Sequence, residues 1–207
     1  MSLYREPPES VTVQGKEYPV DTDFRRWIEF QGMLVAKEDD TTKAERLCGF
    51  MKSLGLPPSQ ESLEAMMEFY SAASQEKPGA GKARPQAFDF EQDSEFIFSA
   101  FWECYGIDLS IVKLHWWRFK ALFKSLPQDC EICRIMGYRT ADMKDVPKHQ
   151  KQFYREMKAR YALNGGNPAY RTEQDMKDYV KRRYEEAQIR MSLLRGGGQS
   201  GDAGSKS

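Results

Sequence analysis

The residues best suited to chemistry are four cysteines and two histidines. Cys130 and Cys133 form a single CxxC motif. A structural zinc ion would need a second ligand pair, and His115 and His149 do not stand at metal-ligand spacing. A redox dithiol normally follows a strand of an α/β fold, and the sequence predicts no such strand before Cys130. We therefore expect two half-buried helical cysteines, with no bound metal, no cofactor and no required disulfide.

A second candidate is the GAGK stretch at residues 79–82, which superficially resembles a phosphate-binding loop. A Walker loop needs GxxxxGK followed by Ser or Thr, between a strand and a helix, whereas Ala83 follows Lys82 here. The sequence also contains no GxSxG, no HExxH and no glycine-rich dinucleotide loop. No carboxylate stands alone in an apolar run of the kind that raises a pKa. The chain is therefore expected to bind other molecules rather than to act as an enzyme, and no catalytic residue is assigned.

Composition indicates a packed domain in a reducing compartment. The chain has 207 residues, of which 40% are hydrophobic, and this is enough for a sizeable core. The N-terminal residues lack an apolar signal segment, and no later run approaches 18 apolar residues, so neither secretion nor membrane spanning is expected. Four cysteines in a chain of this size do not make a disulfide framework, which favours a cytoplasmic setting.

The net charge of zero hides an asymmetry along the chain. Residues 1–108 contain 11 Lys+Arg and 20 Asp+Glu, whereas residues 109–207 contain 20 and 11. A basic half can indicate contact with nucleic acid. The two halves can equally face one another within the fold or between subunits. We favour this second interpretation, because no motif that combines aromatic and basic residues for single-strand binding accompanies the charge.

The elements that would position these residues are organised around residues 88–126, which hold seven of the twelve Phe and three of the four Trp. Helical periodicity predicts two helices here, separated at Tyr105-Gly106. Asp89 is placed to cap the first helix, with Gln92 in capping-box position, and Gly106 to end it. The second helix is predicted from about residue 110 to 125.

The two adjacent tryptophans of this second helix cannot share one pocket, because neighbouring positions differ by 100° around the axis. Trp116 is predicted to be core, and His115 to be a satisfied core histidine rather than a ligand or base. Trp117 projects elsewhere, beyond a narrow strip of lysines. It is either core against another helix, which we favour, or an exposed anchor. The residues of this candidate surface are Trp117, Leu114, Ala121, Lys113, Lys120 and Lys124.

Patterns in the rest of the chain predict a mainly α protein, a helical bundle of about seven or eight helices with a small N-terminal β-hairpin. The hairpin occupies residues 11–20, and helices follow Thr22 or Asp23, Thr42 and Pro57-Pro58-Ser59. Later helices are predicted at 129–136, ended by Gly137, and at 148–161. Two subdomains are expected: a hairpin and helical subdomain at residues 11–74 and a central aromatic subdomain at 88–163, joined by a linker at 75–87. A flexible N-terminal segment at 1–10 precedes them. A hinge at 164–171, a C-terminal helix at 172–194 and a disordered tail at 195–207 follow them.

Four blocks of the sequence resemble a known bacteriophage family. They are FDFEQDSEFIFSAFWECYGIDL, LHWWRFKALFKSLP, ICRIMGYRTADM and FYREMKARYAL, with looser similarity upstream at YPVDTDFRRWIEF. The family is the one called "gene product fifteen", found in tailed phages and prophages of Gram-positive bacteria. The resemblance covers about residues 18–163.

The resemblance implies a tail protein encoded near the tape-measure gene, acting as a tail-assembly chaperone. Its expected partners are the tape-measure protein and the major tail protein. It would work in the cytoplasm of the bacterial host and be absent from the mature virion. The alternative is a nucleic-acid-binding phage protein that uses the basic C-terminal half.

A chaperone for a helical client needs an exposed apolar stripe. Besides the Trp117 surface, the final helix offers one that follows a Gly-Gly hinge and need not dock on its own domain. We expect it to act between molecules, in client binding or self-association. Its residues are Val180, Tyr184, Ala187 and Met191.

Overall fold

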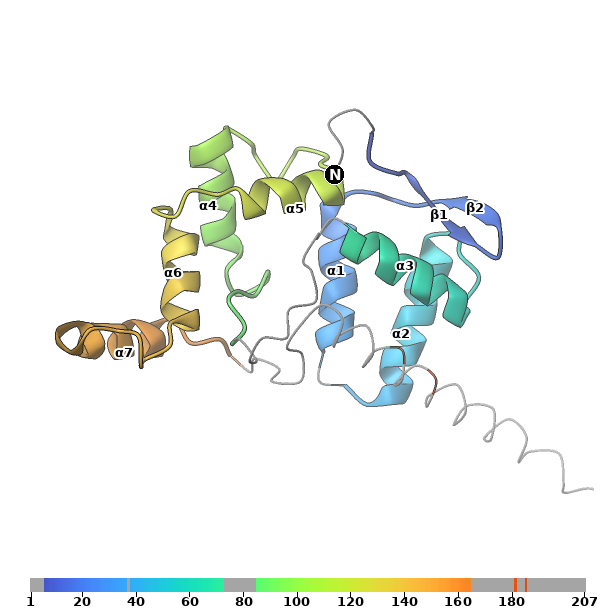
Figure 1. The fold of residues 1–207 in the computed structure, drawn as a ribbon. Helices are drawn as coiled ribbons and strands as arrows, with labels where there is room; N and C mark the ends of the chain where they lie inside the picture. The colour runs from blue at the N-terminus through green and yellow to red at the C-terminus, as the bar shows by residue number, and fades with distance from the viewer. Residues whose placement is uncertain (1–5, 37, 73–84, 165–180, 182–184, 186–207) are drawn as a thin grey trace, which may run out of the picture.

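The computed structural model describes residues 6–36, 38–72 and 85–164, together with Lys181 and Glu185. Figure 1 shows a hairpin followed by seven helices in this part of the chain. The elements are β1 (Ser10–Val13), β2 (Lys16–Pro19), α1 (Phe24–Val35), α2 (Asp40–Ser53), α3 (Gln60–Ala72), α4 (Ser94–Tyr105), α5 (Trp116–Lys124), α6 (Glu131–Thr140), the 3₁₀ turn η1 (Lys148–Gln150) and α7 (Lys151–Arg160). The predicted mainly α fold with a small N-terminal hairpin is confirmed. Most of the predicted linker, hinge, C-terminal helix and tail lies outside the described residues.

The hairpin forms at the expected place and packs on a helix. β1 and β2 are antiparallel, with Val11 opposite Tyr18 and Val13 opposite Lys16. Gln14 and Gly15 both have positive φ, 51° and 77°, as the tight turn of a two-residue hairpin loop requires. Two strands alone are only marginally stable. β1 packs against α3 and buries Val11 and Val13, which stabilises the hairpin.

The first three helices begin at side-chain caps that the sequence marks. The Asp23 carboxylate accepts the Arg25 N–H, and the Asp39 carboxylate accepts the N–H groups of Thr41 and Thr42. α2 therefore starts at Asp40, two residues before the predicted helix start at about residue 42. The Ser59 hydroxyl accepts the Ser62 N–H at the start of α3. Each bond satisfies a helix N–H that has no partner inside the helix.

α5 begins at Trp116, and the prediction of a helix from residue 110 is wrong. Residues before Trp116 instead pair with the chain ahead of α1. Phe24 N–H donates to the Leu114 carbonyl over 2.9 Å, and Trp116 N–H donates to the Thr22 carbonyl over 2.8 Å. This short antiparallel bridge uses the backbone groups that a helix would need. Lys113 and Leu114 are therefore not on the α5 helix.

Two further boundaries differ from the prediction. α4 begins at Ser94, because Asp89 caps a separate turn by accepting the N–H groups of Glu91 and Gln92. α6 continues through Gly137 to Thr140, since a helical glycine lowers stability without stopping a packed helix. The end of α4 is as predicted: Gly106 has φ 64°, and Ile107 N–H donates back to the Phe101 carbonyl.

One aromatic core joins the hairpin, the first three helices and the aromatic-rich stretch. Phe119 of α5 stacks on Phe24 of α1, at 4.6 Å between centroids, and on Phe101 of α4, at 5.1 Å. Tyr70 of α3 stacks on Trp116 at 5.2 Å. One cluster of buried side chains includes residues from Val11 in β1 to Ile132 in α6. Among the described helices, none is both long and apolar enough to cross a membrane.

Candidate functional site

Trp117 is packed inside the fold and is not an exposed anchor. Its indole N–H donates to the Phe69 carbonyl at the end of α3 over 2.8 Å, and its ring lies 5.6 Å from the Phe69 ring. The side chain is half-buried. Of the two interpretations of this residue, the structure supports core packing against another helix.

The predicted strip of lysines does not form one helix face. The Lys120 ammonium donates to the Tyr70 carbonyl over 3.2 Å and lies over the Tyr70 and Trp116 rings. Lys113 precedes α5 in the extended segment, and Lys124 is exposed near the helix end. The structure therefore does not assemble these residues with Trp117 and Leu114 into a single binding surface.

The second predicted surface, at Val180, Tyr184, Ala187 and Met191, lies outside the described residues. Two helical residues of that segment, Lys181 and Glu185, are described. Lys181 forms an ion pair of 2.8 Å with Glu64, and Glu185 accepts a hydrogen bond of 2.9 Å from the Gln60 amide. Both partners belong to α3, and both members of the ion pair are about half exposed.

His115 is a helix cap rather than a ligand or a base. Its Nδ1 accepts the Trp117 N–H over 3.0 Å, and its Nε2 lies 3.0 Å from the Pro8 carbonyl, to which the neutral ring donates. Burial lowers the pKa of His115 from its ordinary value, while the Pro8 hydrogen bond acts in the opposite direction. Both ring nitrogens have a hydrogen-bond partner, as predicted, but the side chain is half-buried rather than in the core.

Three of the four cysteines lie close enough together to affect one another. Burial is the main cause that raises the pKa of Cys133, to about 12, and Cys130 and Cys104 add to it. Burial also raises the pKa of Cys104, followed by the effects of Cys130, Glu103 and Asp129. Such thiols stay protonated near neutral pH, and protonated thiols are poor nucleophiles and poor metal ligands. In the described part of the chain, no group of three or more His, Cys, Asp or Glu residues is placed to hold a metal ion.

The sequence interpretation missed an exposed aromatic face on α4. Phe98 and Trp102 are four residues apart on one side of the helix, with 36% and 53% of their surfaces exposed. Glu95, Ser99 and Glu103 are exposed beside them. Ile97, Ala100 and Phe101 occupy the opposite, buried side. Helical phase alone separates these two sets, but it does not say which apolar set another helix covers.

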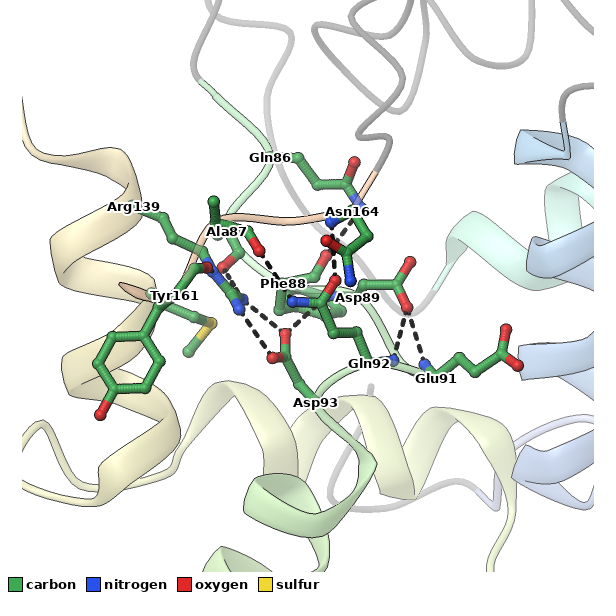
Figure 2. Close-up of polar contacts among 12 residues, drawn as sticks. Gln86, Ala87, Phe88, Asp89, Glu91, Gln92, Asp93, Arg139, Tyr161 and Asn164 are labelled. Atoms are coloured by element: carbon green, nitrogen blue, oxygen red, sulfur yellow. Dashed lines mark hydrogen bonds and ion pairs between the residues drawn. The ribbon is translucent and has the colours of Figure 1, made fainter. Parts of the chain in front are cut away.

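A buried ion pair ties together the two ends of the segment 85–164 (Figure 2). The Arg139 guanidinium on α6 binds both carboxylate oxygens of Asp93, at 2.6 and 2.8 Å, with 5% and 1% of the two side chains exposed. Arg139 also donates to the carbonyls of Ala87 and Tyr161. The Asp93 carboxylate accepts the Asp89 N–H as well. We call this group of residues the clasp.

Gln92 connects the clasp to Asn164, at the end of the segment 85–164. Its amide donates to the Ala162 carbonyl over 3.0 Å and accepts the Asn164 N–H over 2.8 Å. Figure 2 shows the chain near residue 86 lying beside Asn164. The contacts of the clasp therefore join α6, the start of α4 and both ends of the segment 85–164.

A family model described as "Bacteriophage Gp15 protein" matches residues 5–163, which is more than half of the chain. The chain belongs to the bacteriophage Gp15 protein family. No curated protein and no solved structure matches it. The exposed α4 face and most of the clasp fall within the part that the Gp15 family model covers, whereas Lys181 and Glu185 fall outside it.

Proposed function

We propose that this Gp15 family protein is a phage tail-assembly chaperone, which binds the tape-measure protein or major tail subunits without catalysis. Family membership makes it a phage protein, and the resemblance described above implies a role beside the tape measure. The observation that carries the proposal further is the exposed aromatic face of α4. The protein would act in the cytoplasm of the bacterial host and leave before the virion is complete.

The α4 face has the properties of a surface that receives a helix. Phe98 and Trp102 protrude one turn apart, at the spacing of an apolar stripe on a client helix. Rigid aromatic side chains contribute strongly to binding, because they bury a large area and lose little conformational entropy. A long helical client such as the tape-measure protein would offer successive apolar stripes to this face.

Co-expression with the neighbouring tail proteins, followed by affinity capture, tests the proposal. Wild-type protein should retain the tape-measure protein or major tail protein. Phe98→Ser with Trp102→Ser should reduce the captured amount at least about tenfold, the loss of about 1.4 kcal/mol of binding. Ile111→Ser is the matched control, because Ile111 is 79% exposed but lies outside α4. Failure of wild-type protein to capture either tail protein would overturn the proposal.

The alternative is a nucleic-acid-binding role, and one observation favours it. Around α7, the exposed Phe153 and half-buried Tyr154 lie among Lys148, Lys151 and Arg155. Aromatic rings beside cations are the usual platform for single-stranded nucleic acid. Binding of this kind should weaken steeply as salt rises, because phosphate contacts release counterions. A salt titration with single- and double-stranded DNA and RNA separates the two functions.

A further inference from the structure

Two helices of this protein present outward faces of opposite charge. Residues 85–112, which include α4, contain six Asp or Glu and no Lys or Arg, and one of the six, Asp93, is paired with Arg139. Residues 146–164, which include α7, contain five Lys or Arg and one Glu. None of the α7 residues is fully buried, and Phe153 is 47% exposed. Each face therefore combines an exposed aromatic residue with charge mainly of one sign, Glu156 being the exception on α7.

The spacing of the charged and aromatic residues matches between the two faces. On α4, Glu95 precedes the exposed Trp102 by seven residues, and on α7 the exposed Phe153 precedes Arg160 by seven. Seven residues are two helical turns, so each pair lies on one side of its helix, about 10.5 Å apart. Antiparallel packing of the two helices would place Trp102 on Phe153 and Glu95 beside Arg160 at once. Parallel packing would place each charge against an aromatic ring.

We propose that the α4 face of one molecule binds the α7 face of a second copy in this antiparallel arrangement. Within one molecule, α4 approaches the residue that follows α7 through a different side chain, as the Phe96 and Tyr161 rings lie 6.3 Å apart. In Figure 1, α7 projects at the lower left beyond the end of α6, whereas α4 stands at the upper left. The two faces are different surfaces of the chain, and a single contact of this kind is heterologous: it leaves a free α4 at one end and a free α7 at the other.

The contact is weak and sensitive to salt. Two helices of 12 and 10 residues bury less area than a standard interface of about 1,600 Å². The Glu95–Arg160 attraction acts at an exposed site, where salt screens it. The inference rests on the proposed function in one respect: a client helix and the α7 of a second copy occupy the same α4 face, so client binding and self-association exclude each other.

Two complementary variants of the full-length chain test the geometry by sedimentation velocity in low salt. The α4 variant carries Glu95→Arg and Trp102→Ser, and the α7 variant carries Phe153→Ser and Arg160→Glu. Wild-type protein should form a concentration-dependent series that extends beyond dimers. Each variant alone should remain monomeric, with the association constant reduced at least about tenfold. An equimolar mixture should form a dimer and nothing larger, because only one intact α4 face and one intact α7 face remain.

Charge reversal on both faces provides the rescue. A chain with Glu95→Arg and Arg160→Glu retains both aromatic residues and opposite charges. It should regain the concentration-dependent series of oligomers, which Glu95→Arg or Arg160→Glu alone should weaken. Circular dichroism of each variant checks folding, which these exposed substitutions should leave intact.

Three outcomes would overturn the inference. The first is wild-type protein that stays monomeric at high concentration in low salt. The second is a variant mixture that gives no dimer, and the third is a series that nuclease treatment abolishes, which would assign the α7 face to nucleic acid. None of these results affects capture of the tail proteins, so the inference and the proposed function fail separately.

Discussion

At the residue scale, Trp116 and Trp102 occupy opposite environments. Trp116 is 1% exposed, stacks on Tyr70 and donates its indole N–H to the Tyr70 carbonyl over 3.0 Å. Trp116→Ala should lower the free energy of unfolding by about 3–5 kcal/mol, as for other large core aromatics. The matched control, Trp102→Ala, should change it by about 0.5 kcal/mol or less, because the side chain is 53% exposed. Denaturant titration of both variants checks this, and equal losses would contradict the assignment of Trp116 to the core.

His115 gives the folded protein a pH-dependent cap. The neutral ring accepts the Trp117 N–H at Nδ1, and protonation removes that acceptor. Burial lowers the pKa of His115 below its ordinary 6.5, and Arg118 acts in the same direction. The unfolded chain therefore binds this proton more readily. The contribution of His115 to stability is complete above about pH 6.5 and declines as pH falls towards the lowered pKa of the folded state.

Thermal unfolding between about pH 7.5 and pH 5.5 measures this effect as a falling Tm. His115→Asn is the control, because asparagine can accept the same N–H as a helix cap but does not titrate in this range. The variant should lose part of the pH dependence of Tm. An unchanged slope would assign that dependence to other groups.

We expect Cys133 to react slowly and the Cys130–Cys133 pair to bind no metal. Because burial raises the pKa of Cys133 to about 12, its thiol should react slowly with a disulfide reagent at mildly alkaline pH. Replacing Cys130 and Cys133 together with serine should leave folding and partner binding nearly intact. Metal analysis of protein purified without chelator checks the same point, and stoichiometric zinc would overturn it.

At the element scale, sequence patterns predicted what short-range chemistry determines. The cap at Asp23, one of two candidates, the end of α4 at Gly106 and the hairpin within residues 11–20 depend on near neighbours along the chain, and the sequence places all three correctly. The start of α5 was wrong, because residues near position 114 pair with residues near position 23, far away along the chain. The clasp was missed for the same reason: Arg139 looks like an ordinary basic residue of an amphipathic helix until Asp93 is placed beside it.

The choice between the two interpretations of Trp117 depends on a different physical cause. Trp117 and Trp102 are both apolar, but whether each side chain is buried depends on which neighbouring helix covers it. Phe69 at the end of α3 covers Trp117. Trp102 stays about half exposed on the outer side of α4. Such choices arise from tertiary packing, which a single-sequence pattern does not contain.

The clasp should contribute strongly to the packing of α4, α6 and the chain ends on one another. Arg139→Leu leaves the Asp93 carboxylate buried without its cation, and such a change costs about 3–5 kcal/mol. Adding Asp93→Asn to that variant should recover part of the loss, because the stranded charge is then removed. Arg134→Ala is the matched control on the same helix: it breaks the exposed pair with Glu131 and should cost about 1 kcal/mol or less. Equal effects of Arg139→Leu and Arg134→Ala in denaturant titration would contradict the structural role of the clasp.

At the scale of the whole molecule, the predicted subdomains 11–74 and 88–163 share one core. α5 follows the predicted linker in sequence, yet it packs on α1 and reaches α3 through Trp116 and Trp117. The clasp then brings residues 86–93 against residues 161–164, so the second segment begins and ends at the same place. This closure of the segment 85–164 leads to a prediction about the remainder of the chain.

A chain that ends after Asn164 should unfold cooperatively, with a free energy of unfolding within about 1 kcal/mol of full length. The reason is that the described contacts beyond residue 164 are polar: the half-exposed Lys181–Glu64 pair and the part-buried Gln60–Glu185 hydrogen bond. The matched control ends after Arg160. It removes the Tyr161 and Ala162 carbonyls and the Asn164 N–H. Buried Arg139 keeps Asp93 and the Ala87 carbonyl but loses the Tyr161 carbonyl, at about 1–3 kcal/mol for a buried donor left unsatisfied, and the exposed Gln92 loses both partners at little further cost. Denaturant titration of the three lengths measures both losses.

Self-association through α4 and α7 should survive the cut after Asn164, whereas client capture should fall if the final helix binds the tail proteins. Aggregation or non-cooperative melting of the longer truncation would place that helix in the core instead.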